Sequence, residues 1–338
     1  MRLALSENAL GASPNALAAA HAEIEHTHWY PHSDGEPLRG LLATHYGVPE
    51  QKVIVGNGVD EIIMLVALAT SGNDKPTVLT ANTFAGYAAA LEISGHAVTT
   101  VPLATAGGID VDGVCEAAAA ASCVIVCNPH NPTGTALNSE QVKVLVEACH
   151  DAGALLVLDE AYAEFADATR FGSGLPHLHG TGLVVLRTFS KAYGLAGLRC
   201  GYALGDENLI DAMTAIRTAL PYNTNRVALA AAAAALADQD HLRTVVNDCA
   251  VARQVLSSRL ATMGVHSLPS QTNFVLAHLG DDAPAIVERL AGKHKIHIRD
   301  MTGLGLAGWA RISVPRTRDV PLLTSALSSA MAAADAHL

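Results

Sequence analysis

Short apolar runs alternate with longer alanine- and leucine-rich stretches over the first two thirds of the chain. The short runs are rich in valine, isoleucine and leucine, and several are apolar throughout, as are strands buried on both faces of a sheet. The longer stretches are typical of helices, so the alternation predicts parallel strands joined by crossover helices in an α/β domain. The predicted strands are 53–55, 77–80, 97–101, 124–126, 154–158, 183–186 and 201–204, and the predicted helices are 60–70, 86–93, 139–151 and 206–218.

The pattern changes after about residue 236, where a long helix is followed by three separated strands and a terminal helix. The chain has 338 residues, and domains commonly hold about 150, so two domains are expected. We predict a large α/β domain over residues 30–235 and a smaller α+β domain that combines residues 1–29 with 236–338. The elements expected in this last part are a helix at 241–263, strands near 273–278, 296–298 and 310–314, and a helix from about 320.

Composition excludes several classes of protein. Half of the residues are hydrophobic and 16% are charged, which is incompatible with a mainly disordered chain. The apolar runs are too short to cross a bilayer, and no basic leader with a cleavage site begins the sequence. The 21 lysines and arginines face 32 aspartates and glutamates without any basic run. We therefore expect a globular protein that binds neither membranes nor nucleic acids.

The six cysteines lie at irregular spacings and form no C-x-x-C pair. Such spacing is typical of reduced thiols that fill the core of a cytoplasmic protein, so the expected location is the cytoplasm. Four histidines near the amino terminus have no cysteine or carboxylate at ligand spacing, and no metal site is expected from them. These histidines are His21, His26, His28 and His32.

The segment N-P-H-N-P-T-G at 128–134 directly follows the strand predicted at 124–126. Two prolines and a final glycine exclude a helix or a continued strand, so the chain turns at the carboxyl end of that strand. Ligands of open α/β sheets bind at this edge, where the amide of Asn131 could donate to a ligand oxygen. Taken alone, an ordinary proline-rich turn explains the segment equally well.

A carboxylate, Asp159, ends the next buried strand in the segment L-L-V-L-D-E-A-Y. A buried acid is costly without a cationic partner, so Asp159 predicts a buried cation, and Tyr162 is close enough in sequence to reach the same ligand. The alternative is that the carboxylate caps the helix that follows. We assign Glu160 a structural role.

A third segment, R-T-F-S-K-A-Y-G-L-A-G-L-R at 187–199, again follows an apolar strand. Lys191 lies between Ser190 and a loop of small residues. Burial there would lower the pKa of the lysine, and a neutral amine attacks carbonyl groups to form an imine. Thr188, Ser190 and Arg199 supply two hydroxyls and a guanidinium, a set that can hold a phosphate. The alternative is a buried lysine in a structural salt bridge.

Together the three segments describe one cofactor. An imine-forming lysine, a phosphate site, an acid for a buried cation and a Tyr/Asn pair for a phenolate are the groups that hold pyridoxal 5′-phosphate (PLP). The motifs N-P-H-N-P-T-G, D-E-A-Y and T-F-S-K-A-Y-G-L-A-G-L-R, in this order, closely resemble those of fold-type I aminotransferases, and of the histidinol-phosphate aminotransferase family in particular. The resemblance runs from Leu5 to Val314 and implies a large, mostly parallel sheet domain with a smaller α+β domain.

The resemblance implies a role for each residue around the cofactor ring. Lys191 is the residue that forms the imine and moves protons between substrate and cofactor. Asp159 pairs with the pyridine nitrogen and keeps it protonated, while Asn131 and Tyr162 bond the 3′-oxygen. Phe84 corresponds to the aromatic residue that stacks on the ring, although a phenylalanine at a strand end is otherwise a core residue. Lys191, Asp159 and Tyr162 are the predicted catalytic residues.

The cofactor phosphate is expected at the start of a helix. Val59 and Asp60 lie in the segment G-N-G-V-D-E, which opens a predicted helix, and the family binds the phosphate with backbone amides there. By the same resemblance, Thr188, Ser190 and Arg199 complete the phosphate site.

Two arginines and a tyrosine extend the resemblance to the substrate and to a partner. Arg311 corresponds to the residue that binds the substrate α-carboxylate, with Asn131 beside it. Arg299 aligns with an arginine that contacts the phosphate of histidinol phosphate, which favours a substrate with a distal anionic group. Tyr30 corresponds to a tyrosine that reaches the phosphate of the neighbouring subunit, which implies a homodimer.

The resemblance implies transamination between histidinol phosphate and 2-oxoglutarate by a ping-pong route. The alternatives are an aromatic amino-acid aminotransferase that acts on phenylalanine or tyrosine, another PLP reaction such as decarboxylation of a phosphorylated amino acid, and a cofactor-binding regulatory protein without turnover. The chain departs from the family pattern at Ser6 and Ala9, where asparagine and proline are usual, and at Asn82, which replaces a proline. The substrate therefore stays open at this point.

Overall fold

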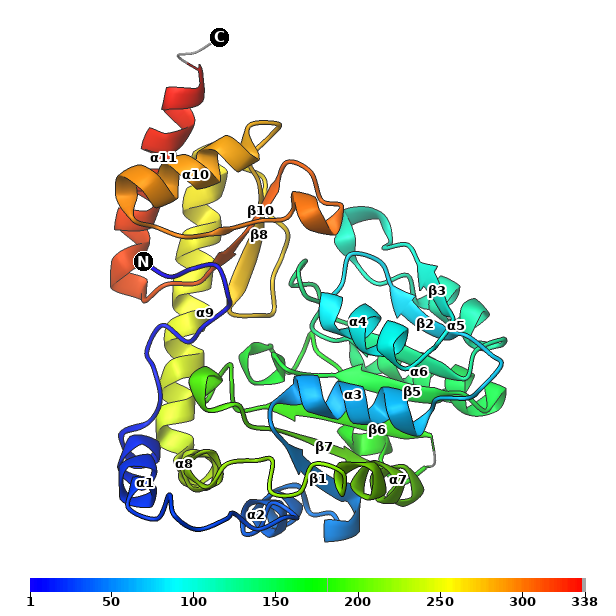
Figure 1. The fold of residues 1–338 in the computed structure, drawn as a ribbon. Coiled ribbons are helices and arrows are strands. Elements are labelled where there is room, and N and C mark those ends of the chain that lie inside the picture. The colour runs from blue at the N-terminus through cyan, green and yellow to red at the C-terminus, as the bar shows by residue number, and fades with distance from the viewer. Residues whose placement is uncertain (181, 336–338) are drawn as a thin grey trace.

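A seven-stranded sheet forms the centre of the larger part of the molecule (Figure 1). The computed structural model describes residues 1–180 and 182–335. In this sheet β7 runs antiparallel to its neighbours β1 and β6, and the other neighbouring pairs are parallel, which confirms the predicted, mostly parallel arrangement. The strands, in their order across the sheet, are β1 (Val53–Gly56), β7 (Gly201–Gly205), β6 (Leu183–Thr188), β5 (Leu155–Asp159), β4 (Cys123–Cys127), β2 (Thr77–Thr80) and β3 (Val98–Val101).

Helices cover both faces of this sheet. Successive residues of a strand point to opposite faces, so Val124 and Val126 of β4 join one core cluster, while Ile125 joins another. The first cluster includes residues of α1, α2, α5, α6 and α8, and the second includes residues of α3, α4 and α7. Burial on both faces explains why these strands are apolar throughout. The helices are α1 (Pro14–Ile24), α2 (Leu38–Tyr46), α3 (Val59–Ala69), α4 (Ala85–Ile93), α5 (Val111–Ala118), α6 (Ser139–Ala152), α7 (Glu207–Arg217) and α8 (Arg226–Ala237).

Local side chains define both ends of α6. Asn138 Oδ1 accepts a hydrogen bond from the backbone N–H of Gln141 at 3.0 Å, and Gln141 Oε1 accepts one from the N–H of Asn138 at 3.0 Å. This reciprocal pair is a capping box. Gly153 ends the helix with a φ of 65°, a left-handed conformation that glycine adopts without strain. Because these signals are local, the predicted helix at 139–151 agrees closely with the structure.

The C-terminal part packs helices against a three-stranded antiparallel sheet of order β8–β10–β9. The long helix α9, yellow in Figure 1, runs from beside α8 up to this small sheet. Val245 near its start and Leu260 near its end belong to one core cluster with residues of α10, α11 and the small sheet. The elements are α9 (Gln239–Thr262), β8 (Phe274–His278), α10 (Ala283–His294), β9 (Arg299–Asp300), β10 (Trp309–Ser313) and α11 (Val320–Asp335).

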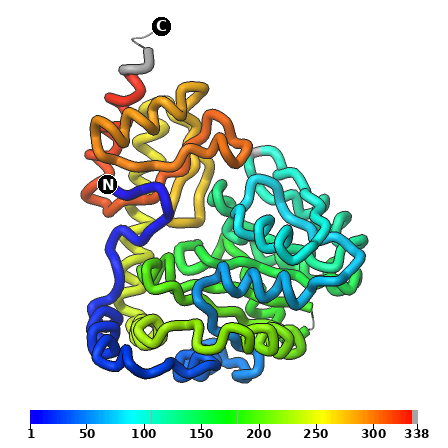
Figure 2. Tube along the Cα trace, viewed as in Figure 1, coloured from blue at the N-terminus to red at the C-terminus, as the bar shows by residue number. Residues whose placement is uncertain are grey.

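The first residues of the chain pair with the C-terminal part. Leu3 N–H donates to the carbonyl oxygen of His297 at 2.7 Å, and His297 N–H donates to that of Met1 at 2.9 Å. From there the chain descends to α1, which packs beside α8 (Figure 2). Short 3₁₀ turns lie at Glu50–Lys52, Thr105–Gly107, Ala163–Phe165, Leu175–His177, Ala196–Leu198, Thr302–Leu304 and Thr317–Asp319.

The strand predicted at 296–298 was wrong in its position. Lys295 follows α10 in a left-handed conformation, with a φ of 55°, and His297 then forms an isolated bridge to Arg2. The strand β9 begins two residues later and pairs with β10. These partners are remote in sequence, so the local hydrophobic pattern does not reveal them.

The division of the chain into residues 30–235 and the remainder stays a prediction, and residues 336–338 of its second part lie outside the described residues. None of the helices in the described part of the chain is long and apolar enough to cross a membrane.

Candidate active site

One pocket lies over the carboxyl-terminal ends of β4, β5 and β6, next to the small sheet. It has a volume of about 420 Å³. The large sheet and its connections provide most of its lining, and the small sheet adds one arginine from β9 and one from β10. The pocket brings together every predicted site residue except Tyr30, namely Val59, Asp60, Phe84, Asn131, Asp159, Tyr162, Thr188, Ser190, Lys191, Arg199, Arg299 and Arg311.

Lys191 lies three residues beyond the end of β6 and is half-buried. Its Nζ donates to the carbonyl oxygen of Leu5 at 3.1 Å and lies 5.6 Å from the centre of the Tyr162 ring. Burial, together with the positive charges of Arg311 and Arg199, lowers the pKa of Lys191 to about 8. A much larger fraction of this amine is therefore neutral near pH 7 than for a free lysine, and the neutral form is the nucleophile.

Asp159 is the last residue of β5, and its side chain is buried. Its Oδ2 accepts a hydrogen bond from the Tyr87 hydroxyl at 2.5 Å, and its Oδ1 accepts one from the backbone N–H of Ala161 at 3.0 Å. Burial raises the pKa of Asp159 to about 6. Among the described residues it forms no ion pair, so a cation on a bound ligand would relieve the cost of burying this carboxylate.

Asn131 and Arg311 meet at the boundary between the two sheets. Asn131 Oδ1 accepts a hydrogen bond from Arg311 Nη1 at 2.5 Å, which leaves the amide N–H groups of Asn131 as donors for a ligand. Arg311 Nη2 donates to the carbonyl oxygen of Ala4 at 2.9 Å. Phe274 orients two site residues, because the Arg311 guanidinium lies 5.1 Å from its ring centre and the Tyr162 ring meets it edge-on at 5.2 Å.

The start of α3 forms one end of the pocket. Gly58 occupies the position before the helix. Within the described residues no side chain caps the backbone N–H groups of the first turn, where Val59 and Asp60 line the pocket. Such a helix start attracts anions. Gly58 has a φ of 86°, and a Cβ atom there would lie 2.5 Å from Arg199 Nη2, so the close approach of this arginine to the helix requires glycine.

Arg199 connects the helix start with the segment that carries the lysine. Its Nη1 donates to Ser190 Oγ at 3.4 Å, and its Nη2 donates to Asp60 Oδ2 at 2.6 Å. Thr188 Oγ1 accepts a hydrogen bond from the backbone N–H of Ser190 at 3.0 Å. A phosphate would suit this set of groups, which comprises the guanidinium, the two hydroxyls and the uncapped helix start. It would compete with the exposed Asp60 carboxylate for Arg199.

Arg299 and Arg311 face each other across β9 and β10. Side chains directly opposite on antiparallel strands lie on the same face of the sheet, and both of these line the pocket. Arg311 is buried and Arg299 is exposed. Because like charges at such positions repel, the arrangement favours a ligand with more than one negative charge.

Comparison with known proteins now identifies the family. A family model described as aminotransferase class I and II matches residues 1–327. The chain belongs to this family. Histidinol-phosphate aminotransferases from Bacillus subtilis (strain 168) and Anaeromyxobacter sp. (strain Fw109-5) are 37% and 36% identical to it, over 93% and 98% of this chain and 87% and 91% of theirs.

A solved structure also supports the assignment of this chain to the aminotransferase family. The histidinol-phosphate aminotransferase of Sinorhizobium meliloti, in complex with pyridoxal-5′-phosphate, matches with a TM-score of 0.89 and 32% sequence identity. The match covers 98% of this chain and 90% of the other. The family and the fold that the sequence predicted are confirmed.

Tyr30 lies outside the pocket of this aminotransferase. Its side chain is 79% exposed, and its ring packs on Tyr222 at a centroid distance of 4.8 Å. Arg226 anchors the segment, because its Nη1 donates to the Tyr30 carbonyl oxygen at 3.0 Å and its guanidinium lies 5.7 Å from the Trp29 ring centre. The proposed role of Tyr30 in a neighbouring subunit stays a prediction.

Sequence reasoning missed several residues of the aminotransferase pocket. Two of them carried a signal in the sequence: Tyr87 lies three residues after Phe84, and Cys127 ends β4 at the edge where the other site residues gather. Glu160, to which we assigned a structural role, lies outside the pocket and is fully buried against Arg187, 2.6 Å from its Nη2. The missed pocket residues are Leu5, Glu7, Tyr87, Cys127, Ala161, Ala196 and Gly197.

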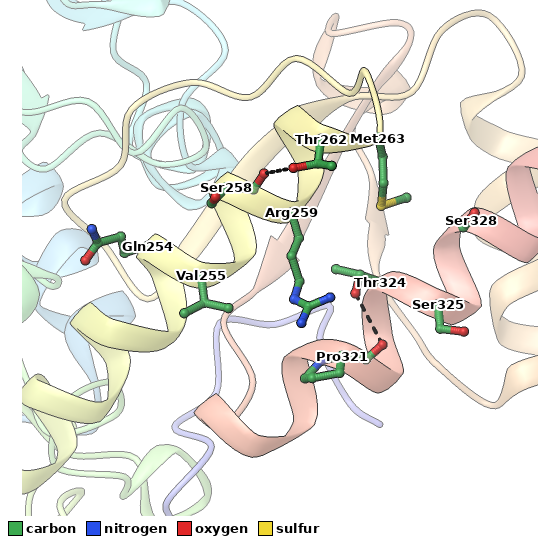
Figure 3. Close-up of a pocket in the computed structure, with 10 residues that line it drawn as sticks. All are labelled: Gln254, Val255, Ser258, Arg259, Thr262, Met263, Pro321, Thr324, Ser325 and Ser328. Atoms are coloured by element: carbon green, nitrogen blue, oxygen red, sulfur yellow. Dashed lines mark hydrogen bonds between the residues drawn. The ribbon is translucent and has the colours of Figure 1, made fainter.

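A larger hollow of about 700 Å³ lies between α9 and α11 (Figure 3). Arg259 extends into it among serine and threonine side chains. The hydroxyls of Thr262 and Thr324 already donate to backbone carbonyl oxygens of their own helices. None of the predicted site residues lines this hollow. In the described part of the aminotransferase, no group of three or more His, Cys, Asp or Glu side chains could hold a metal ion.

Proposed function

We propose that this aminotransferase binds PLP in the pocket and exchanges amino groups between histidinol phosphate and 2-oxoglutarate by ping-pong kinetics. The observation that carries the proposal is the facing pair Arg299 and Arg311 in one pocket with Lys191. Histidinol phosphate carries a phosphate dianion, and glutamate and 2-oxoglutarate each carry two carboxylates. A ping-pong enzyme binds both substrates in one site, and two guanidiniums suit each of them. Phenylalanine and tyrosine carry a single carboxylate.

The pocket fits PLP at three points. The buried carboxylate of Asp159, which has no ion pair among the described residues, suits the protonated ring nitrogen. The uncapped start of α3 with Arg199 beside it suits the phosphate. Lys191, whose pKa is lowered to about 8, suits the aldehyde carbon.

Each residue around the ring has a separate task. When bound, PLP supplies an electron-accepting ring that stabilises negative charge at the substrate α-carbon. Asp159 holds the proton on the ring nitrogen, Asn131 and Tyr162 donate to the 3′-oxygen, and Phe84 packs on the ring face. Lys191, which lines the same pocket, would take the proton from the substrate α-carbon and deliver it to C4′ of the cofactor, and would move it in the opposite direction in the second half-reaction.

The remaining residues hold the two anionic ends. The backbone N–H groups of Val59 and Asp60, the hydroxyls of Thr188 and Ser190, and the Arg199 guanidinium bind the cofactor phosphate. On the substrate side, Arg311 binds the α-carboxylate of glutamate with the help of the Asn131 amide. Arg299 binds the second carboxylate of glutamate or the phosphate of histidinol phosphate.

A titration of the first half-reaction tests this function. The purified, PLP-loaded protein receives histidinol phosphate in one cuvette and phenylalanine in another, and the visible band of the bound cofactor is followed. We expect conversion at low concentrations of histidinol phosphate and poor conversion by phenylalanine. The reverse preference would identify an aromatic amino-acid aminotransferase. Loss of carbon dioxide from a phosphorylated amino acid without conversion of the cofactor would identify a decarboxylase.

Arg299→Ala should separate the two substrate classes. We expect the apparent affinity for histidinol phosphate to fall about tenfold to a hundredfold, because one charge-assisted contact is lost, while phenylalanine is little affected. The same titration measures both. Arg318→Ala is the matched control, since Arg318 is exposed on the C-terminal part outside the pocket. An equal loss for both substrates would remove the reason for preferring the phosphorylated one.

We further propose that two copies of the chain form a dimer in which Tyr30 contacts the cofactor phosphate of the other copy. The support is its 79% exposure at a site where Tyr222 and Arg226 hold it in place. Trp29, beside it, is also exposed, and exposed aromatic side chains of this kind favour association.

Co-expression of two impaired variants tests the dimer. Tyr30→Ala should bind PLP weakly, and Lys191→Ala should be inactive. In a mixed dimer, one site combines an intact Lys191 with the intact Tyr30 of the other subunit, so activity at limiting PLP should recover on co-expression. If Tyr30 acted within its own subunit, the mixture would stay as inactive as its components. If it had no contact with the cofactor, Tyr30→Ala alone would bind PLP like the wild type.

A further inference from the structure

Tyr87 is a buried tyrosine of the pocket to which no role has yet been assigned. It lies in the first turn of α4, and its side chain is fully buried. Its hydroxyl donates to Asp159 Oδ2 at 2.5 Å, a short distance that is typical of an O–H donor to a charged oxygen. Burial and the negative charge of Asp159 raise the pKa of Tyr87 well above its usual value, so the phenol keeps its proton and stays a donor.

The carboxylate of Asp159 has one donor on each oxygen. Tyr87 serves Oδ2, and the backbone N–H of Ala161 serves Oδ1 at 3.0 Å. Both donors are neutral, so they orient the carboxylate and favour its charged form without neutralising it. Of the two, only the tyrosine can be removed by a substitution that keeps the backbone unchanged.

Tyr87 also contacts the aromatic residue proposed to pack on the cofactor ring. The Phe84 and Tyr87 rings meet edge-on, with centroids 5.4 Å apart and planes at 83°. Gly86 between them leaves room for this arrangement, because a Cβ atom at that position would collide with the Phe84 ring. Tyr87 therefore contacts both Phe84, the proposed stacking residue, and Asp159, the proposed partner of the ring nitrogen.

We propose that Tyr87 is a positioning residue for the cofactor, whose hydrogen bond keeps Asp159 ionised and aimed at the ring nitrogen and thereby keeps that nitrogen protonated. The inference rests on the proposed function, in which Asp159 pairs with the ring nitrogen of PLP. Tyr87 acts through Asp159 and takes no part in proton transfer at the substrate.

Removal of the hydroxyl should weaken cofactor binding in a predictable direction. A hydrogen bond to a carboxylate lowers its pKa, so Tyr87→Phe raises the pKa of Asp159 above its present value of about 6. More molecules then carry a neutral Asp159 near pH 7, and a neutral acid does not attract the ring cation. We expect the dissociation constant of PLP to rise about tenfold to a hundredfold.

Two measurements on Tyr87→Phe test the proposal. Absorbance titration of the cofactor-free protein with PLP gives the dissociation constant, and ¹⁵N NMR of bound, ring-labelled PLP reports whether the ring nitrogen carries a proton. The expected result is weaker binding together with a ¹⁵N signal displaced toward the unprotonated position. Neither readout depends on turnover.

Tyr202→Phe is the matched control. Tyr202 is also fully buried in the large sheet, and its hydroxyl lies 2.6 Å from that of Tyr46, so the substitution removes a similar hydrogen bond away from Asp159. We expect wild-type PLP binding and a wild-type ¹⁵N signal. If Tyr202→Phe had the same effect as Tyr87→Phe, the loss would be one of general packing and the proposal would be overturned.

A second background separates this inference from the proposed function. With Asp159→Asn already in place, adding Tyr87→Phe should leave the ¹⁵N signal unchanged, because the charged intermediary is gone. A further displacement would overturn the proposal. A wild-type protein whose bound PLP is unprotonated at the ring nitrogen would contradict the role of Asp159 itself. A protonated wild type with an identical Tyr87→Phe variant would overturn only the role of Tyr87.

Discussion

Lys191→Ala is expected to remove the visible absorbance band that depends on the bond between the lysine and PLP, and to reduce turnover at least about a thousandfold, because nucleophile and proton carrier are lost together. The neighbourhood of Lys191 serves both tasks: burial and the charges of Arg311 and Arg199 lower its pKa to about 8. Absorbance spectra and the half-reaction titration measure the two losses separately.

Lys52→Ala is the control for Lys191→Ala. Lys52 Nζ also donates to a backbone carbonyl oxygen, that of Leu178 at 2.8 Å, but it lies outside the pocket. Its loss should leave the spectrum and turnover unchanged. An unaltered spectrum and rate in Lys191→Ala would contradict the assignment of this lysine, whatever the behaviour of the control.

The pKa of Lys191 also gives the sign of a pH effect. The free amine is the reactive form, and its fraction grows as the pH rises through about 8. The rate at which the cofactor-free protein attaches PLP should therefore increase between pH 7 and 9 and then level off. A rate that stays constant over this range would show that the amine is already neutral, contrary to the environment described for it.

The position of the site could be predicted from the sequence because three polar or charged residues lie at or just after the ends of three apolar strands. Strands apolar on both faces are central strands, and their carboxyl ends lie at one edge of the sheet. Asn131, Asp159 and Lys191 were therefore expected to come together, and they line one pocket. Asp159 lines the pocket, whereas Glu160 points away from it toward Arg187, because successive residues at the end of a strand point to opposite faces of the sheet.

The contacts among these residues could not be predicted in the same way. Tyr87 belongs to a helix that packs on the sheet. Its spacing from Phe84 suggests that it lies near the pocket, but its local sequence does not distinguish a core tyrosine from a donor to Asp159. The pairing of Arg299 with Arg311 depends on the position of β9 beside β10, and the sequence pattern predicted this strand at 296–298 instead of at Arg299–Asp300. Just before β9, His297 forms a bridge to Arg2, a partner from the other end of the chain that no local pattern reveals.

The amino-terminal segment makes contacts in the substrate part of the pocket that also could not be predicted from the sequence. Its backbone carbonyl oxygens accept hydrogen bonds from two site residues, Leu5 from Lys191 and Ala4 from Arg311. Ser6 directly follows these two residues. It is fully buried and has a φ of 55°, a conformation that asparagine adopts more readily than serine. The departure from the family pattern at this position therefore falls on a segment that contacts both the lysine and the carboxylate-binding arginine.

Asp159→Asn is expected to reduce turnover by about a hundredfold to a thousandfold, comparable to the loss of a main electrostatic contact in other active sites. An amide does not hold a proton on the ring nitrogen, so the ring accepts electrons less readily from the substrate α-carbon. Binding of PLP should weaken at the same time, because the buried negative charge that favours the ring cation is gone. The half-reaction rate and the dissociation constant of PLP measure the two effects.

Asp248→Asn provides the control, since Asp248 Oδ1 accepts a hydroxyl hydrogen bond from Thr317 at 2.9 Å, much as Asp159 accepts one from Tyr87, but in the C-terminal part. It should leave both quantities unchanged. Asp159→Asn also tests whether Asp159 sets the pH dependence of PLP binding: wild-type binding should weaken as the pH falls through about 6, where the carboxylate gains a proton, and the variant, with no titrating acid at this position, should lack that dependence. A variant that kept that dependence, or that transaminated at the wild-type rate, would show that another group pairs with the ring nitrogen.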